Sequence, residues 1–135
     1  MILIIGGGAS GCSAGIQAAH MGMETIIVEE SPWLGGMLTS AGVTATDGCY
    51  NLRGGLFAEF TDRLASYYGS YDALKTGWVS NILFEPHVGE QIFETLCGNE
   101  NNLTIVKNAR FTSLKKNEKG WSVTFEKKDG STLHT

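Results

Sequence analysis

The beginning of the chain contains the feature that most constrains its fold, three glycines in the spacing GxGxxG between two apolar segments. The apolar run Ile2–Ile5 precedes this motif at residues 6–11, and Thr25–Glu29 is a second run rich in β-branched residues. Short, wholly apolar segments are typical of strands in a parallel sheet that is covered on both faces. Residues Ser10–Met21 have the pattern of a helix, so the chain is predicted to begin with a right-handed β-α-β unit.

Each glycine of the motif has a separate role in binding a dinucleotide. Gly6 permits a tight turn, Gly8 lets the backbone approach a pyrophosphate, and Gly11 lets the helix pack close to the strand. The pyrophosphate then lies at the helix N-terminus, where free N–H groups and the helix dipole favour negative charge. Glu29 follows Gly11 by about 20 residues, at the end of the second strand, which is the position of a carboxylate that binds ribose hydroxyls.

The remainder of the chain predicts two more helices and a β-rich end. Apolar residues at helical spacing predict helices over Leu56–Tyr68 and Glu85–Leu96, whereas residues 31–55 indicate an ordered loop and 69–84 are assigned to no element. The residues at helical spacing in the first of these helices are Leu56, Phe57, Phe60, Leu64 and Tyr67. The last forty residues alternate between apolar and polar and contain two turn signals, which predicts a strand followed by a β-meander.

Composition excludes several classes of function. A chain of 135 residues suits one domain, and a net charge of −4 without clustered Lys or Arg argues against nucleic-acid binding. No apolar stretch approaches the ~20 residues that span a bilayer, so no membrane partner is expected. The three cysteines, Cys12, Cys49 and Cys97, form neither a disulfide framework nor a metal-binding pair. The sequence leaves open a cytoplasmic location or, if a leader is removed, a periplasmic one.

The glycine and acid spacing over residues 1–36 resembles the FAD-binding part of the glutathione-reductase-like flavoproteins, which carry two dinucleotide-binding motifs. The matching positions are Gly6, Gly8, Gly11, Gly15, Gly22, Glu29, Gly35 and Gly36. The resemblance implies an α/β, Rossmann-like FAD/NAD(P)-binding fold with a parallel sheet and a C-terminal β-meander. It also implies FAD as the cofactor, because NAD dehydrogenases share the first motif but lack the second diglycine.

Three further segments, LGGMLTSAGV, LRGGLFAEFTDRL and FEPHVGEQIFETL, resemble a bacterial group of FAD-dependent oxidoreductases, some of them described as xanthan-lyase-related. The segment NLTIVKNARFTSL resembles the stretch that passes the adenine in these proteins, and it places Phe111 near that ring. The resemblance therefore implies a cofactor-binding set of Gly6, Gly8, Ala9, Ser10, Gly11, Glu29, Gly35, Gly36, Met37 and Phe111.

The resembling proteins complete the FAD domain with a later strand and a glycine-rich turn, and they insert a substrate domain. Neither is found in residues 1–135, so we expect this chain to be the N-terminal fragment of an FAD-binding domain. Without the later strand one edge of the sheet lacks a partner, and an open apolar edge favours association. We therefore expect the fragment to hold FAD poorly, to be inactive alone and to associate with itself.

The leading hypothesis is an FAD-dependent oxidoreductase whose flavin accepts a hydride from an organic small molecule that the sequence does not identify. Alternatives are an NAD-dependent dinucleotide-binding enzyme and a noncatalytic or carbohydrate-associated module that retains the fold. His87, at the start of a predicted helix, is the candidate for proton transfer. Arg53 is a candidate for contacting the pyrophosphate or a substrate carboxylate, and Cys12 is expected to pack behind the phosphate loop.

Overall fold

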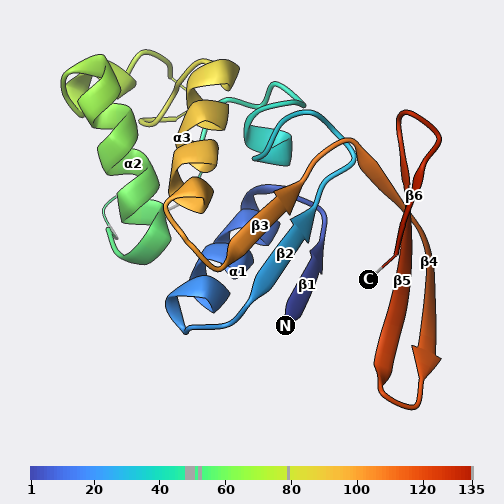
Figure 1. Ribbon diagram of the computed structural model, residues 1–135. Helices are drawn as coiled ribbons and strands as arrows, with labels where there is room; N and C mark the ends of the chain where they lie inside the picture. The colour runs from blue at the N-terminus through green and yellow to red at the C-terminus, as the bar shows by residue number, and fades with distance from the viewer. Residues whose placement is uncertain (48–50, 52, 79, 135) are drawn as a thin grey trace.

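Two sheets organise the chain (Figure 1). The computed structural model describes residues 1–47, 51, 53–78 and 80–134. A parallel sheet has the order β1-β2-β3 and consists of β1 (Ile2–Ile5), β2 (Thr25–Val28) and β3 (Leu103–Val106). An antiparallel meander has the order β4-β5-β6 and consists of β4 (Ala109–Asn117), β5 (Gly120–Lys127) and β6 (Thr132–His134). This arrangement confirms the predicted Rossmann-like α/β class with a C-terminal meander.

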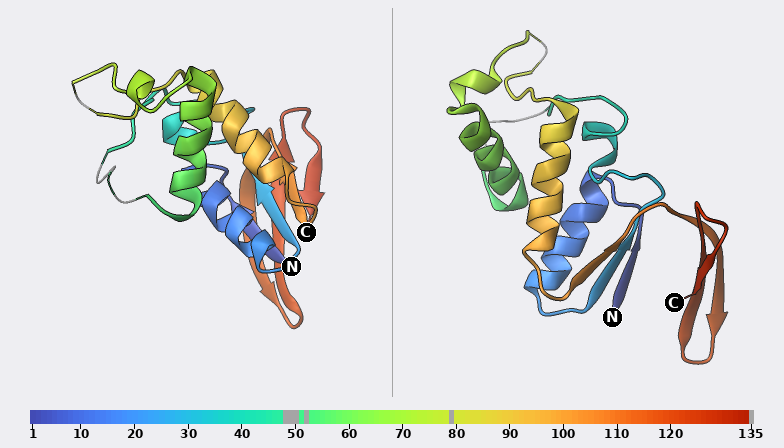
Figure 2. Two further views of the ribbon diagram at one scale, coloured as in Figure 1. Left: turned by 90° about the vertical axis from the view of Figure 1, so that its left-hand side faces the viewer. Right: turned by 45° about the horizontal axis from the view of Figure 1, so that its top comes forward.

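The helices lie on one face of the parallel sheet and the meander lies on the other, as Figure 2 shows. The α-helices are α1 (Ala9–His20), α2 (Gly55–Tyr68) and α3 (Pro86–Gly98), and the 3₁₀ turns are η1 (Gly36–Leu38) and η2 (Asp72–Leu74). The three α-helices begin and end within two residues of the predicted positions. Pro86 occupies the first turn of α3, where its missing N–H costs little. None of the described helices is long and apolar enough to cross a membrane.

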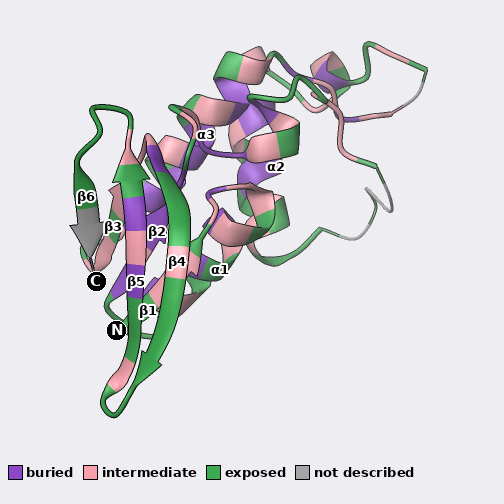
Figure 3. Cartoon of the chain, turned by 90° about the vertical axis from the view of Figure 1, so that its right-hand side faces the viewer, coloured by how far each residue is buried: buried purple, intermediate pink, exposed green. Residues whose placement is uncertain are grey.

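Alternation along the parallel strands divides the core into two clusters. Ile4 and Ile27 pack against the helices, whereas Leu3 and Val28 pack against the meander, where Phe125 is fully buried. The sheet is therefore covered on both faces, as its continuous apolar strands predict. In Figure 3 the buried residues follow the inner faces of these layers, while most of β4 is exposed.

Only part of the apolar face predicted for α2 is buried. Phe60 and Leu64 are buried as expected, but Tyr67 is 58% exposed and the neighbouring Tyr68 packs on the core instead. The buried stripe also includes Thr61, whose hydroxyl donates to the Phe57 carbonyl at 3.0 Å and so needs no other partner. The buried face of α2 is therefore rotated from the predicted face toward Thr61 and Tyr68.

A short connection joins the two sheets beside β2. Asn108 adopts a left-handed backbone with φ +57°, and its N–H donates to the Ser31 carbonyl at 3.3 Å. The next N–H, that of Ala109, donates to the Glu29 carbonyl at 3.0 Å. These two bonds fix the start of the meander next to the end of β2, where the acid predicted to bind ribose lies.

Candidate functional site

The first glycine loop leaves no room for side chains at the positions that hold it together. Gly6 has φ +100°, which side chains rarely permit, and a Cβ added to Gly11 would lie only 1.9 Å from the Gly6 carbonyl oxygen. Further along α1, a Cβ on Gly15 would lie 2.6 Å from Ile27 Cδ1 on β2. Glycine is therefore required here for the tight turn and for the close packing of α1 on the sheet, as the motif predicts.

The N-terminus of α1 is open and carries no cap. Its N-cap is Gly8, which has an extended backbone and no side chain to accept the first N–H groups. The first N–H groups of a helix have no acceptor within it, and in α1 these belong to Ala9, Ser10 and Gly11. A Cβ added to Gly8 would meet no atom within 4 Å, so the space beside the N-cap is open. Such an arrangement suits an anionic group.

The diglycine at residues 35–36 lies directly against this loop. The Gly35 N–H donates to the Gly7 carbonyl at 2.8 Å, and Gly35 pairs with Gly8 as an isolated parallel bridge. Gly36 has φ +55°, and its added Cβ would lie 3.0 Å from the Gly8 Cα. The two glycine-rich segments thus form one surface of bare backbone, although about 27 residues separate them in the sequence. Met37, which follows in η1, is largely exposed.

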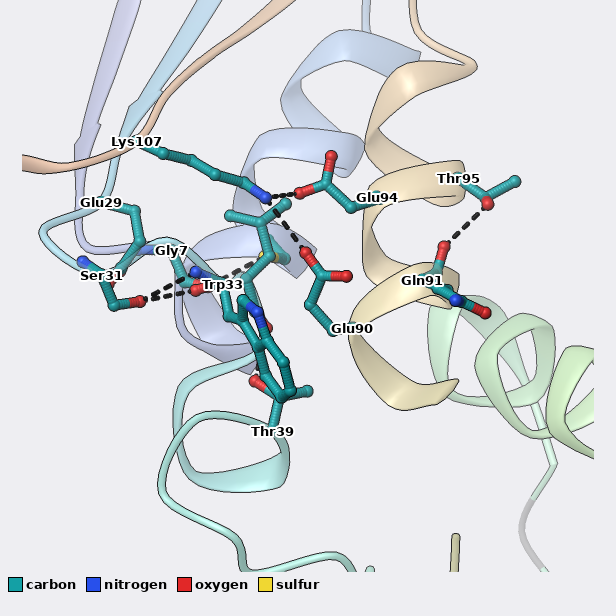
Figure 4. A network of polar contacts seen from close by, with 12 residues as sticks. Gly7, Glu29, Ser31, Trp33, Thr39, Glu90, Gln91, Glu94, Thr95 and Lys107 are labelled. Carbon is teal, nitrogen blue, oxygen red and sulfur yellow. Dashed lines mark hydrogen bonds and ion pairs between the residues drawn. The ribbon is translucent and has the colours of Figure 1, made fainter. Parts of the chain in front are cut away.

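Glu29 is held by two backbone donors next to the same loop. Its Oε2 accepts from the Gly7 N–H at 2.6 Å and its Oε1 accepts from the Ser31 N–H at 2.8 Å (Figure 4). A carboxylate offers about four acceptor sites, so one on each oxygen remains for another donor. The adjacent Glu30 is exposed, as expected for the next residue along an extended strand.

Polar contacts fix the chain that carries the diglycine. The Ser31 hydroxyl donates to the Trp33 carbonyl at 2.7 Å, and the buried Thr39 hydroxyl donates to the Leu34 carbonyl. Both contacts close the loop onto its own backbone, so residues 31–39 form an ordered turn rather than a linker. Figure 4 shows this segment between the glycine loop and α3.

Lys107, just after β3, ties that strand to α3. Its Nζ lies 3.0 Å from Glu90 Oε1 and also forms an ion pair with Glu94 (Figure 4). Burial alone lowers the pKa of Lys107, but hydrogen bonds to Glu94 and Glu90 outweigh it and raise that pKa above its usual value. No pattern in the sequence predicts this cluster, because Lys107 lies on a different element from Glu90 and Glu94 and follows them by more than ten residues.

Cys12 packs behind the phosphate loop, as predicted. Its side chain is fully buried, and its Sγ donates to the Gly7 carbonyl at 3.2 Å. Cys97 is also fully buried, and its hydrogen bond with Cys12, together with burial, raises its pKa. Both therefore support the core under the loop. Cys49 lies outside the described residues.

A cleft beside Glu29 was not anticipated from the sequence. It has a volume of about 480 Å³ and lies where the end of β2 meets the meander. Its lining residues are Glu30, Ser31, Asn108, Arg110, Glu126, Lys127 and Lys128. Arg110, which forms an ion pair with Glu126 at 3.0 Å, contributes to the lining, whereas Phe111 packs against Phe125 with ring centroids 6.2 Å apart.

The two remaining candidates lie elsewhere. His87 is exposed in the first turn of α3, and that end of the helix packs near Thr39 because a Cβ on Gly89 would lie 3.3 Å from Thr39 Cγ2. Arg53 forms an ion pair with Asp62 and a hydrogen bond to the Tyr71 hydroxyl, so its charge is already paired. No group of three or more potential metal ligands occurs among the described residues.

Comparison with known proteins agrees with this geometry. Among solved structures, AlpK superimposes with a TM-score of 0.62 at 13% identity, covering 98% of this chain and 28% of that one. A flavoprotein/dehydrogenase from Cytophaga hutchinsonii gives 0.60 at 14% identity, covering 98% and 36%. The flavin-dependent monooxygenase PieE, solved in complex with FAD and substrate, gives 0.57 at 16% identity, covering 98% and 28%. This chain therefore spans about a third of their lengths.

These likenesses establish the fold, and the family follows from a separate comparison. The comparison with curated proteins found no match. A family model described as FAD dependent oxidoreductase matches residues 2–135, which is nearly the whole chain. With its paired glycine segments, its uncapped helix and its acid at the end of β2, the chain belongs to the FAD dependent oxidoreductase family.

Proposed function

We propose that this chain supplies the part of an oxidoreductase that binds the adenosine diphosphate half of FAD. The observation that carries the proposal is the contact between the two glycine segments. A Cβ added to Gly36 would lie only 3.0 Å from the Gly8 Cα. That contact leaves a strip of bare backbone beside the uncapped start of α1. A pyrophosphate needs both the N–H donors and the space that such a strip provides.

The proposal assigns each portion of the cofactor to residues of this chain. The pyrophosphate accepts hydrogen bonds from the first N–H groups of α1, around Ser10. Ribose hydroxyls donate to the unused acceptor sites of Glu29, whose orientation is fixed by Gly7 and Ser31. The adenine occupies the cleft that Arg110 lines. The role of Phe111 as an adenine neighbour stays a prediction, in which its main chain rather than its ring makes the contact.

When bound, FAD supplies a flavin ring that accepts a hydride from an organic substrate. The residues of this chain bind and orient the cofactor, and they provide charge at the ribose and the pyrophosphate. The proton-transfer role of His87 is part of this proposal. So are the transfer of hydride from a substrate to the flavin and the reoxidation of the flavin by an electron acceptor. Because this chain is about a third as long as the solved structures it resembles, we expect residues 1–135 alone to be inactive.

A titration of the 135-residue chain with FAD, ADP and NAD tests the proposal. We expect FAD and ADP to bind with similar, modest affinity, because this chain contacts the part that they share. Glu29→Ala should weaken both by about 1–3 kcal/mol, the value of a charge-assisted hydrogen bond. Glu24→Ala is the matched control, because this acid is exposed just before β2, does not line the cleft and should change ADP affinity little.

Circular dichroism on the same samples separates lost binding from lost folding, since Glu29 also holds Gly7 and Ser31. Equal ADP affinity of the Glu29→Ala and Glu24→Ala variants would remove Glu29 from the ribose site. Binding of NAD without binding of FAD by a longer form of the protein would favour the alternative of an NAD-dependent enzyme. A longer form that folds and binds neither nucleotide would favour a noncatalytic module.

A further inference from the structure

A small cavity lies between the first half of α2 and the chain around η2. It has a volume of about 190 Å³ and shares no lining residue with the cleft assigned to adenine. Its lining residues are Asn51, Arg53, Phe57, Thr61, Tyr71, Lys75, Asn81 and Ile82. These residues belong to three segments between residues 51 and 82, so packing within this chain creates the cavity.

Arg53 is fixed in the wall of this cavity by only one of its nitrogens. Its guanidinium carbon lies 4.0 Å from the centroid of the Tyr71 ring, and its bonds to Asp62 and to the Tyr71 hydroxyl are both made by Nη2. A guanidinium carries five N–H donors in a planar fork. Among the described residues Arg53 has no other acceptor, so its Nε and Nη1 donors can bind a ligand. That fork matches a carboxylate or a phosphate.

The charges in the lining are both positive. Lys75 is the second cation, and its Nζ lies 2.8 Å from Asp72 Oδ1. Neither Asp72 nor Asp62 lines the cavity, and the described lining residues include no acid. The lining is therefore positive although the whole chain carries a net charge of −4. Such a lining favours an anion.

The rest of the lining combines amide groups with an apolar wall. The side chains of Asn51 and Asn81 form no hydrogen bond to any described residue, so their donors and acceptors can bind polar groups of a ligand. Ile82 is buried and Phe57 is 36% exposed, and both present carbon atoms to the cavity. An inorganic anion gains nothing from this apolar wall, whereas the carbon skeleton of an organic acid packs on it.

Backbone hydrogen bonds hold the segment at residues 80–83 in place. The Leu83 N–H donates to the Leu74 carbonyl at 3.1 Å, and the Thr46 N–H donates to the Ile82 carbonyl at 3.1 Å. The segment is thus tied both to η2 and to the chain before α2. Because this wall is already ordered, a ligand loses little free energy in ordering it.

We propose that this cavity binds a small organic carboxylate. The carboxylate accepts hydrogen bonds from Arg53 and is attracted by the charge of Lys75, while the carbon skeleton lies against Phe57 and Ile82. The volume of about 190 Å³ is below the range of about 300–1,000 Å³ that holds drug-sized ligands, so the ligand is a small molecule. The proposal goes beyond the binding of FAD and does not depend on it.

Titration of the chain with three probes, followed by amide NMR shifts, tests the proposal. The probes are butyrate, its uncharged counterpart butyramide, and inorganic phosphate, which has charge but no carbon skeleton. We expect butyrate to bind at least about tenfold more tightly than either of the others, because it alone uses both the cations and the apolar wall. Binding of phosphate or butyramide as tightly as butyrate overturns the proposal, and so does the absence of butyrate binding.

Three variants locate the site. Arg53→Gln should weaken butyrate binding by about tenfold or more, and Lys75→Gln should weaken it less, because Lys75 contributes as a point charge. Lys115→Gln is the matched control, since it removes the same charge at an exposed position of β4 that does not line the cavity.

Lys75→Gln also guards against a folding defect, because Arg53 bonds to Asp62 and Tyr71 whereas the ion pair of Lys75 with Asp72 is exposed. Circular dichroism confirms that each variant is folded. Butyrate affinity that is unchanged in both Arg53→Gln and Lys75→Gln overturns the proposal. Equal weakening by Lys115→Gln also overturns it, because the effect then reflects the net charge of the chain rather than this cavity.

Discussion

The α/β body (residues 1–106) and the β-meander (residues 109–134) use glycine for different reasons. In the body, a Cβ on Gly11 or Gly15 would overlap neighbouring atoms at 1.9 Å and 2.6 Å. In the meander, Gly120 and Gly130 have positive φ values of +146° and +81°, yet an added Cβ would meet nothing within 4 Å. Gly11 and Gly15 are therefore required by close packing, whereas Gly120 and Gly130 are required only by the local geometry of their turns.

The two regions also differ in how they contribute to the proposed site. The body supplies bare backbone and the carboxylate of Glu29, which is held by hydrogen bonds at 2.6 Å and 2.8 Å. The meander contributes exposed side chains such as Arg110, and its buried residues, Phe125 among them, pack on the body. We therefore expect some mutations in the body to impair folding and others to impair nucleotide binding. In the meander we expect the loss of stability to follow how deeply the mutated side chain is buried.

The largest effect is expected within the glycine loop itself. Gly11→Ala should destabilise the chain by about 3 kcal/mol or more, because the new Cβ overlaps the Gly6 carbonyl and the backbone must move. Gly8→Val should leave the chain folded, since the space there is open, but should abolish FAD and ADP binding by filling the place of the pyrophosphate. Urea unfolding and nucleotide titration of both variants provide the two measurements.

Gly98→Ala is the control for this pair. Gly98 ends α3 with no atom within 4 Å of an added Cβ, so alanine there should be neutral or slightly stabilising. Wild-type stability of Gly11→Ala, or ADP binding retained by Gly8→Val, would contradict the division of roles within the loop.

The meander should show an effect that depends on burial. Phe125→Ala should lower the free energy of unfolding by about 3–4 kcal/mol, because the ring is fully buried against β2 and leaves a cavity. Phe111→Ala, on the opposing strand but 41% exposed, should cost about 1 kcal/mol. Chemical denaturation measures both. Equal costs would mean that the meander does not pack on the sheet as described.

The smallest effect is expected at the ion cluster that joins β3 to α3. Lys107→Met should destabilise the chain by about 1 kcal/mol, because Glu90 and Glu94 are left without their cation. The raised pKa of Lys107 means that its contribution is complete below the usual value of 10.5 and is lost as pH rises through the higher folded value. Thermal unfolding of wild type and variant between neutral and alkaline pH should therefore converge at the alkaline end.

Several features could be predicted because they depend on neighbouring residues. The helix boundaries, the turns of the meander and the packing of Cys12 behind the loop follow from local patterns and from the glycine spacing. The buried face of α2 could not be predicted fully, since Tyr67 and Tyr68 have similar chemistry and only tertiary packing selects which of the two is buried. The cleft beside Arg110 and the cluster around Lys107 also depend on contacts between distant segments.

The pattern of residues is enough to specify the glycine loop, the acid after β2 and the family, because positive φ values and close backbone approaches can be met only by particular residues at particular spacings. Which groups meet depends on how the whole chain packs. This packing brings Gly35 onto Gly7, uses one acceptor site on each oxygen of Glu29, and places Trp121 beside Leu3 and Ile5 in one cleft. These outcomes depend on the order of strands in the sheet, and strand order is set by packing over the whole chain rather than by any local pattern.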